Sequence, residues 1–352
     1  MIYNTGVSAC VPAKRIEYFD YLRVFATFSV MILHISAQNW YTTDVNGIEW
    51  QVFNFFDSIV RWGVPVFVML SGALFLNREI TIRKLFSKYI LRLVISYVVW
   101  SAIYALFSNG DAKVRFSNLI LGHYHMWFIP MTVGTYICIP FIKSIIENEK
   151  NVKYYLVLSF VFAFFIPELF RLSCDFAGKI ITWGVSAVSK YANIMNVNIV
   201  LGYTGYFILG YYLNKVDLGK EQRIIVYVLG LLGFISTIYL DLMAALKTQK
   251  CSGNYYGDFN VNVLLESIAV FTWFKYKNAS GSRIILKLSK FSFGAYLVHA
   301  LVIEQLDALL GLNTLSFNPI FAVSVISIIV FIISYLISAI LNQIPILKKY
   351  IV

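Results

Sequence analysis

Arg23 and His34 are the residues of the first apolar stretch whose types and spacing could support chemistry. Eleven helical residues turn by about 1100°, so the two side chains share one face and lie about 16 Å apart along the axis. A neutral imidazole can act near pH 7 as a general base or as a nucleophile. Asp20 precedes Arg23 by three residues and can pair with it. Ionisable groups inside a membrane usually face a bundle interior or a wet cavity, so the pair predicts a polar path along this helix. The alternative is an Arg23 that reaches the headgroups and a His34 that only packs.

Two further charged pairs lie in the next two apolar stretches. Asp57 and Arg61 are four residues apart within FFDSIVRWGVPVFVMLSGALF and can pair on one helix face. Lys88 and Arg92, also four apart, form a basic step at the start of the third stretch. An arginine fork can bind two oxygens of one anion or stabilise a developing oxyanion. Plain anchoring at the membrane surface is the alternative for Lys88 and Arg92.

The sequence offers no pattern typical of a metal site, and none is expected. His123 and His125 are alternate residues, which would face apart on a helix. The four cysteines are far apart and form no Cys-x-x-Cys motif, although Cys174 and Cys251 could pair if both face outward. His299, in the ninth apolar stretch, is expected to be a packed, hydrogen-bonded residue rather than a catalyst.

Membrane-crossing helices must position these side chains. Of 352 residues, 59% are hydrophobic and 13% charged, with a mean hydropathy of +0.72. A soluble domain needs more polar surface, so the predicted fold class is an all-α integral membrane protein, with 1–352 as a single polytopic domain. Residues 178–196 are expected to form an amphipathic surface helix. About ten stretches approach the length of a membrane helix: Tyr18–Ala37, Val52–Leu76, Leu85–Phe107, Met126–Ile146, Tyr154–Phe170, Val197–Leu213, Ile224–Leu246, the short Val261–Phe274, Phe291–Leu310 and Ile320–Leu341.

The basic residues predict an orientation for these helices. With the N-terminus inside, 20 lysines and arginines lie in inward segments and 7 in outward loops. By the positive-inside rule, both termini, including segments 1–17 and 342–352, are predicted to be cytoplasmic. Arg23 is then near the cytoplasmic surface and His34 lies toward the outer half. An anionic lipid leaflet accounts for the net charge of +11 without a nucleic-acid partner.

Four stretches resemble the membrane-bound acyltransferase-3 family, in the order that the family has them. FDYLRVFATFSVMILHIS is similar to its first helix, with Arg-x10-His at Arg23 and His34, and RWGVPVFVMLSGALFL is similar to its second. HMWFIPMTVGTYICIPFI resembles its His-Leu-Trp-Phe segment, and FSFGAYLVHALV resembles its Ser-Tyr-Gly-x-Tyr-Leu-x-His stretch. One departure is in the third helix, where Tyr89 stands in place of the first arginine of Arg-x-x-Arg. Arg92 matches the second, and Lys88 is the candidate substitute for the missing charge.

The resemblance implies transfer of an acyl group, often acetyl, onto a carbohydrate of the cell surface, in the cell membrane. Acyl-coenzyme A, acetyl-CoA in the usual case, is then the cytoplasmic donor, and a surface or lipid-linked carbohydrate is the acceptor. The phosphates of acyl-coenzyme A suit Lys88, Arg92 and Arg23. His34 would be the general base or the acyl carrier, and Arg61 would stabilise the oxyanion or orient the sugar. Asp57, at a depth similar to His34, is a candidate carboxylate partner.

Two other functions fit buried charges in many membrane helices. One is a transporter or flippase for a glycolipid or small solute, although no half-to-half symmetry is visible. The other is a scaffold in a polysaccharide-export complex. Trp127 could stack on a sugar, or it could belong to an aromatic belt at the membrane surface.

Overall fold

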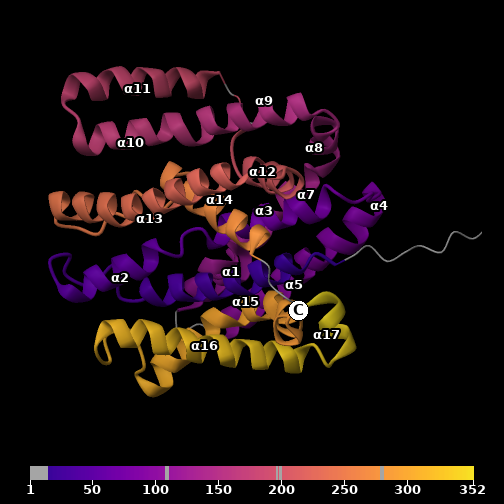
Figure 1. Ribbon diagram of the computed structural model, residues 1–352. Coiled ribbons are helices and arrows are strands. Elements are labelled where there is room, and N and C mark those ends of the chain that lie inside the picture. The colour runs from indigo at the N-terminus through magenta and orange to yellow at the C-terminus, as the bar shows by residue number, and fades with distance from the viewer. Residues whose placement is uncertain (1–14, 108–110, 196, 198–199, 278–280) are drawn as a thin grey trace, which may run out of the picture.

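The computed structural model describes residues 15–107, 111–195, 197, 200–277 and 281–352, and throughout these ranges the only regular structure is helical (Figure 1). The helices are α1 (Glu17–Ser36), α2 (Ile48–Ser58), α3 (Gly63–Phe75), α4 (Ile82–Lys84), η1 (Leu85–Ile90), α5 (Leu91–Phe107), α6 (Ala112–Leu121), η2 (Tyr124–Trp127), α7 (Phe128–Ile137), α8 (Ile139–Ile146), α9 (Glu149–Ser159), η3 (Phe160–Phe165), α10 (Ile166–Phe176), α11 (Lys179–Ile194), α12 (Thr204–Lys215), α13 (Lys220–Thr248), α14 (Val261–Tyr276), α15 (Arg283–Leu310), α16 (Pro319–Leu341) and α17 (Pro345–Tyr350).

Seven helical segments among the described residues are long and apolar enough to cross a membrane, or eight if a bent pair counts as one span. The bent pair joins 112–137 to α8 at an angle of 55°. Of the ten predicted stretches, the sixth and eighth fall short, because α12 has 12 residues and α14 has 16. The sixth stretch was predicted to begin at Val197, whereas α12 begins at Thr204, and the eighth, predicted to be short, agrees with α14 to within two residues.

Helix α1 lies at the centre of the bundle and packs against α2, α3, α14, α15 and α16. It joins two apolar cores. Leu22 and Ala26 belong to the core around α3 and α12, whereas Met31 and Ile35 belong to the core around α2, α15 and α16. Because α1 is held on so many sides, its Arg23–His34 face has a fixed position against its neighbours.

Two glycines allow α3 and α12 to cross in backbone contact. A Cβ atom on Gly72 would lie 1.8 Å from the carbonyl oxygen of Phe207, and one on Gly210 would lie 1.9 Å from that of Met69. Any larger residue would force the helices apart.

The segment α9–α11 forms one edge of the molecule, with α11 packed on α10 (Figure 1). Helix α11 matches the predicted amphipathic segment and leaves Trp183 and Tyr191 exposed. Cys174 and Cys251 are free thiols, so the disulfide between them that the sequence allowed is not formed.

Candidate functional site

One cavity of about 370 Å³ contains both residues of the Arg-x10-His pattern. Arg23 lines one end of it and His34 the other, which confirms that they share one face of α1. Its walls come from six parts of the chain: Arg23, Val30, Leu33 and His34 of α1; Arg61, Val64, Phe67 and Ser71 of the turn before α3 and of α3; Leu93 of α5; His125, Trp127, Phe128, Ile129, Thr132 and Tyr136 of η2 and α7; Tyr256, Gly257 and Asp258 of the loop before α14; and Ser292, Phe293 and Tyr296 of α15.

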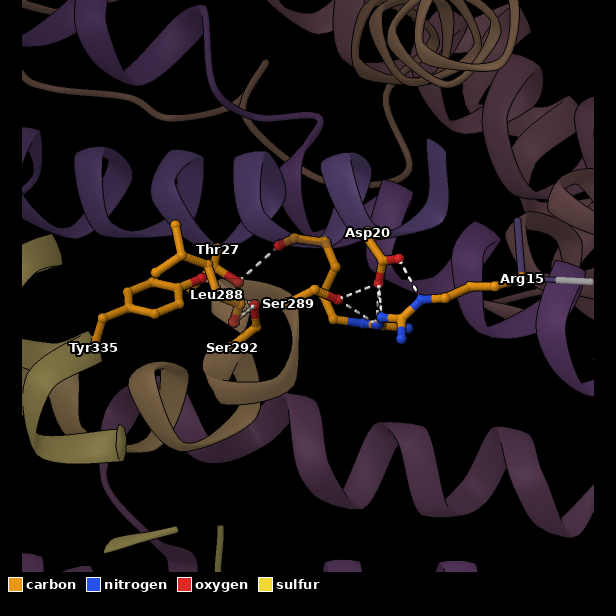
Figure 2. A network of polar contacts seen from close by, with 8 residues as sticks. Arg15, Asp20, Thr27, Leu288, Ser289, Ser292 and Tyr335 are labelled. Carbon is orange, nitrogen blue, oxygen red and sulfur yellow. Dashed lines mark hydrogen bonds and ion pairs between the residues drawn. The ribbon is translucent and has the colours of Figure 1, made fainter. Parts of the chain in front are cut away.

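The Arg23 end of the cavity is held by a polar network between α1 and α15 (Figure 2). Arg23 Nη1 donates to Ser289 Oγ at 2.7 Å and lies 3.6 Å from Asp20 Oδ1. The predicted Asp20–Arg23 ion pair is therefore present, but Asp20 has closer partners. Arg15 donates to both of its carboxylate oxygens at 2.7 Å, and Ser289 donates at 2.6 Å. Asp20 thus ties α1 to α15 and leaves the Arg23 guanidinium at the cavity wall.

Arg61 and Asp57 form the predicted ion pair at a break between two helices. Arg61 Nη2 donates to Asp57 Oδ2 at 2.5 Å, and their side chains are 18% and 1% exposed. The guanidinium also lies 4.0 Å from the centre of the Tyr256 ring, a cation–π distance. The helix expected over 52–76 is divided here, since α2 ends at Ser58 and α3 begins at Gly63. Arg61 lines the cavity. Asp57 does not line it, but its ion pair holds the Arg61 guanidinium in place.

All four histidines of the chain gather at the His34 end. The centre of the His34 ring lies 5.2 Å from that of His299 and 6.4 Å from that of His125. His299 is fully buried, with Nδ1 2.5 Å from the carbonyl oxygen of Tyr296. It is packed and hydrogen-bonded, as expected, but its position beside His34 was not predicted.

The expectation that His123 and His125 face apart is wrong. Their Nδ1 atoms lie 3.1 Å apart. The periodicity of an α-helix does not apply, because Gly122 has φ +74°, His123 is extended, and a 3-10 helix begins at Tyr124. In the part of the chain that the structure describes, no group of three or more histidine, cysteine or acidic residues is arranged to hold a metal ion.

Asp258 is a cavity residue that sequence reasoning missed. It lies in the loop between α13 and α14, and the hydroxyl of Tyr203 donates to its Oδ2 at 2.6 Å. Trp127 also lines the cavity, with its ring centre 5.9 Å from that of Tyr203. Burial raises the pKa of Asp258 to about 6, against the lowering effects of Tyr203 and Arg61. Aromatic faces beside a carboxylate are the groups that a sugar ring and its hydroxyls require.

The raised pKa of Asp258 predicts a stability difference that depends on pH. Between pH 4 and 6 the folded protein keeps a proton that the unfolded chain has lost, so this group favours folding more as the pH falls. Lowering the pH from about 7.5 to about 5 should therefore stabilise the wild type relative to Asp258→Asn by roughly 1–3 kcal/mol. Thermal unfolding of both proteins in detergent measures this difference, because all other titrating groups are common to them. Parallel pH curves would contradict the shifted pKa.

Lys88 and Arg92 do not line the cavity. Lys88 is exposed in η1. Arg92 Nη2 donates at 2.5 Å to the carbonyl oxygen of Val352, which is buried, and its guanidinium lies 5.5 Å from the centre of the Phe293 ring. Leu93, the neighbour of Arg92, does reach the cavity. The structure thus brings together Arg23, His34 and Arg61, with Asp57 as support, whereas Lys88 and Arg92, the other two predicted donor residues, do not line the cavity.

Comparison with known proteins agrees with this arrangement. A family model described as an acyltransferase domain matches residues 16–339. Similar proteins include the probable poly-beta-1,6-N-acetyl-D-glucosamine export proteins of Staphylococcus aureus strains MSSA476, MW2 and MRSA252, which are 25%, 25% and 24% identical over 302 residues. The alignments cover 82% of this chain and 82% of each relative. No solved structure matches the chain. Because the family model matches most of the chain, the chain belongs to the acyltransferase-3 family, and the match includes every element that lines the cavity.

Proposed function

We propose that the protein is an O-acyltransferase that moves an acyl group, acetyl as the first candidate, from acyl-coenzyme A to a hydroxyl group of a carbohydrate. The observation that carries this proposal is the single cavity with Arg23 at one end and His34 with Arg61 at the other. An acyl donor and a hydroxyl acceptor that enter from opposite ends would meet inside it.

Four side chains of the cavity have assigned roles in this reaction: His34, Arg61, Trp127 and Asp258. His34 removes the proton of the acceptor hydroxyl, or takes the acyl group first and passes it on. Arg61, fixed by Asp57 and Tyr256, stabilises the negative oxygen that forms on the acyl carbon. Trp127 stacks on the sugar ring, and Asp258 accepts hydrogen bonds from its hydroxyl groups.

The donor phosphates are assigned to Lys88, Arg92 and Arg23. Arg92→Ala should weaken binding of acetyl-coenzyme A by about 10- to 100-fold, the usual effect of removing one charge-assisted hydrogen bond. Arg92→Lys should restore binding only in part, because lysine lacks the planar fork. Titration calorimetry measures both, with exposed Arg83→Ala in α4 as the control that removes an equal charge nearby. Equal affinity of the Arg92→Ala and wild-type proteins would refute the donor assignment.

The orientation that we propose has both termini in the cytoplasm and the protein in the cell membrane. The split of 20 against 7 basic residues supports it, with α12 and α14 as short spans in a total of ten. A reporter enzyme that is active only outside the cytoplasm should be silent when it is fused after Val352. Strong activity of that fusion would overturn the ten-span topology.

The proposed acceptor is a surface or lipid-linked carbohydrate. The similar proteins named above are called poly-beta-1,6-N-acetyl-D-glucosamine export proteins, so a β-1,6-linked oligomer of N-acetylglucosamine is the first acceptor to test. Purified protein with acetyl-coenzyme A and this oligomer should release free coenzyme A and yield an O-acetylated sugar by mass spectrometry. Without thioester consumption, the proposed function is wrong.

Export without acyl transfer is the second candidate. The names of the relatives favour it, and the cavity that runs along α1 is compatible with a solute path. A transporter or flippase would move the labelled oligomer or its lipid-linked form across a liposome membrane while acetyl-coenzyme A stays intact.

A further inference from the structure

A chain of three ionisable side chains leads from the buried end of the cavity to the protein surface. Glu304 Oε1 lies 2.8 Å from His123 Nε2, and His123 Nδ1 lies 3.1 Å from His125 Nδ1. Exposure falls along this chain, from 42% for the Glu304 side chain to 10% for that of His123 and 1% for His125. The mechanism described above uses none of these three groups.

The hydrogen-bond partners determine where the protons of the neutral rings are. A carboxylate only accepts, so His123 carries its proton on Nε2 and accepts on Nδ1. His125 must then donate from Nδ1, which leaves a lone pair on Nε2. That Nε2 is buried, and no hydrogen-bond partner for it is found among the described residues. His125 is therefore a buried base with a free lone pair.

His299 also has a buried ring nitrogen with a free lone pair, but for a different reason. Its Nδ1 must donate to the carbonyl oxygen of Tyr296, so its Nε2 also has a free lone pair, which is buried and has no partner in the part of the chain that the structure describes. The ring centres of His299 and His125 are 5.0 Å apart, and both rings neighbour that of His34. Two unused acceptors beside the proposed catalytic histidine would be costly in a core that serves only for packing.

We propose that His125, His123 and Glu304 form a proton route that carries the proton of the acceptor hydroxyl from His34 to the surface near the end of α15. This inference rests on the proposed acyl transfer and adds to it a direction of proton movement. The tyrosines that surround the route are Tyr104, which stacks on His123 at 4.3 Å, Tyr124 and Tyr296. Arg23 and Arg61 are the cations that line the cavity with His34, and Arg61, at the His34 end, favours departure of the proton away from itself.

The balance of the reaction is as follows for each transfer. The acceptor O–H bond breaks, a new O–C bond forms, and the C–S bond of the thioester breaks. His34 takes the proton and passes it to His125 Nε2, while His125 gives its Nδ1 proton to His123 and His123 gives its Nε2 proton to Glu304. Glu304 releases a proton to water on the outer side, and the thiolate takes one from water on the donor side. Both imidazoles then hold their proton on the other ring nitrogen, and before the next transfer each ring returns to its first tautomer by exchanging one proton with water, without net proton movement.

The test uses protein reconstituted into liposomes with the β-1,6-linked oligomer and a pH-sensitive dye inside. Acetyl-coenzyme A is added outside, so only molecules whose donor side faces outward react. Release of coenzyme A outside should be accompanied by about one proton inside for each transfer. Transfer that leaves the luminal pH unchanged would overturn the route and keep the proposed function. An absence of transfer would refute the proposed function and this inference with it.

Glu304→Gln separates proton transfer from positioning. The glutamine oxygen can still accept the hydrogen bond from His123 Nε2, but it cannot take up the proton. Transfer should therefore fall by about 10-fold, less than the loss of a direct acid–base group, and luminal acidification should disappear. Glu304→Asp, which keeps the acid, should restore both in part. Asp307→Asn, on the same helix and bonded to Asn313 instead, should behave as wild type. Wild-type rate and acidification in Glu304→Gln would contradict the route.

Discussion

Replacing His34 by glutamine should reduce acyl transfer by about 10²–10⁴-fold, the usual contribution of acid–base catalysis, and leave the protein folded in the membrane. Glutamine keeps the approximate size and the hydrogen bonding of the side chain but cannot gain or lose a proton near pH 7. His34 lines the cavity and is only partly buried, so folding should tolerate the change. Release of coenzyme A in the presence of the oligosaccharide measures the effect, and gel filtration in detergent reports folding.

The chain offers no distant histidine as a control, since all four lie in one cluster. Ser36→Ala serves instead, because Ser36 lies two residues on and its hydroxyl donates to the carbonyl oxygen of Leu33 on its own helix. It should transfer at the wild-type rate. Trapping of an acyl-histidine by mass spectrometry would distinguish an acyl carrier from a base. If His34→Gln retained nearly full activity at neutral pH, His34 would not be catalytic, and the α1 face would bind substrate only.

Replacing Asp57 by alanine should destabilise the protein by about 3–5 kcal/mol, the usual cost of leaving one charge of a buried pair without its partner. Asp57 is 1% exposed, and Arg61 would lose the one ion pair that it makes within the described ranges, with the Tyr256 ring as a remaining close contact. The double variant Asp57→Leu/Arg61→Met removes both charges and should recover most of this stability. It should nevertheless be inactive, because the proposed oxyanion contact of Arg61 is gone.

Thermal and denaturant unfolding in the same detergent measure these changes. The matched control is Glu149→Ala, which breaks the Glu149–Lys153 pair, also four residues apart but with both side chains mostly exposed. It should leave unfolding nearly unchanged, because water screens an exposed pair. If the double variant were as unstable as Asp57→Ala, the cost would come from lost packing rather than from an unpaired charge.

The sequence by itself determined the features that depend on helical periodicity and on composition. Arg23 and His34 share a cavity because eleven residues return a helix to the same face. Asp57 and Arg61 pair because four residues span about one turn, even where the helix is interrupted between them. The helical membrane class follows from an apolar fraction of 59%, and family membership follows from motifs that the chain carries in order.

The tertiary structure decided which distant segments meet at each of these residues. Asp20 bonds more closely to Arg15 than to the predicted Arg23. Arg92 contacts Val352, which is 260 residues away. Asp258 reaches the cavity because the loop before α14 folds inward, and no local pattern marks such a loop.

The histidine cluster shows the physical reason most clearly. Gly122 adopts a positive φ that turns the chain out of a helix, so His123 and His125 converge against the predicted spacing. Their partners Glu304 and His299 lie on α15, more than 170 residues later in the chain. Helical periodicity is a local property, whereas the meeting of η2 with α15 depends on how the whole bundle packs, and packing is a property of all the side chains together.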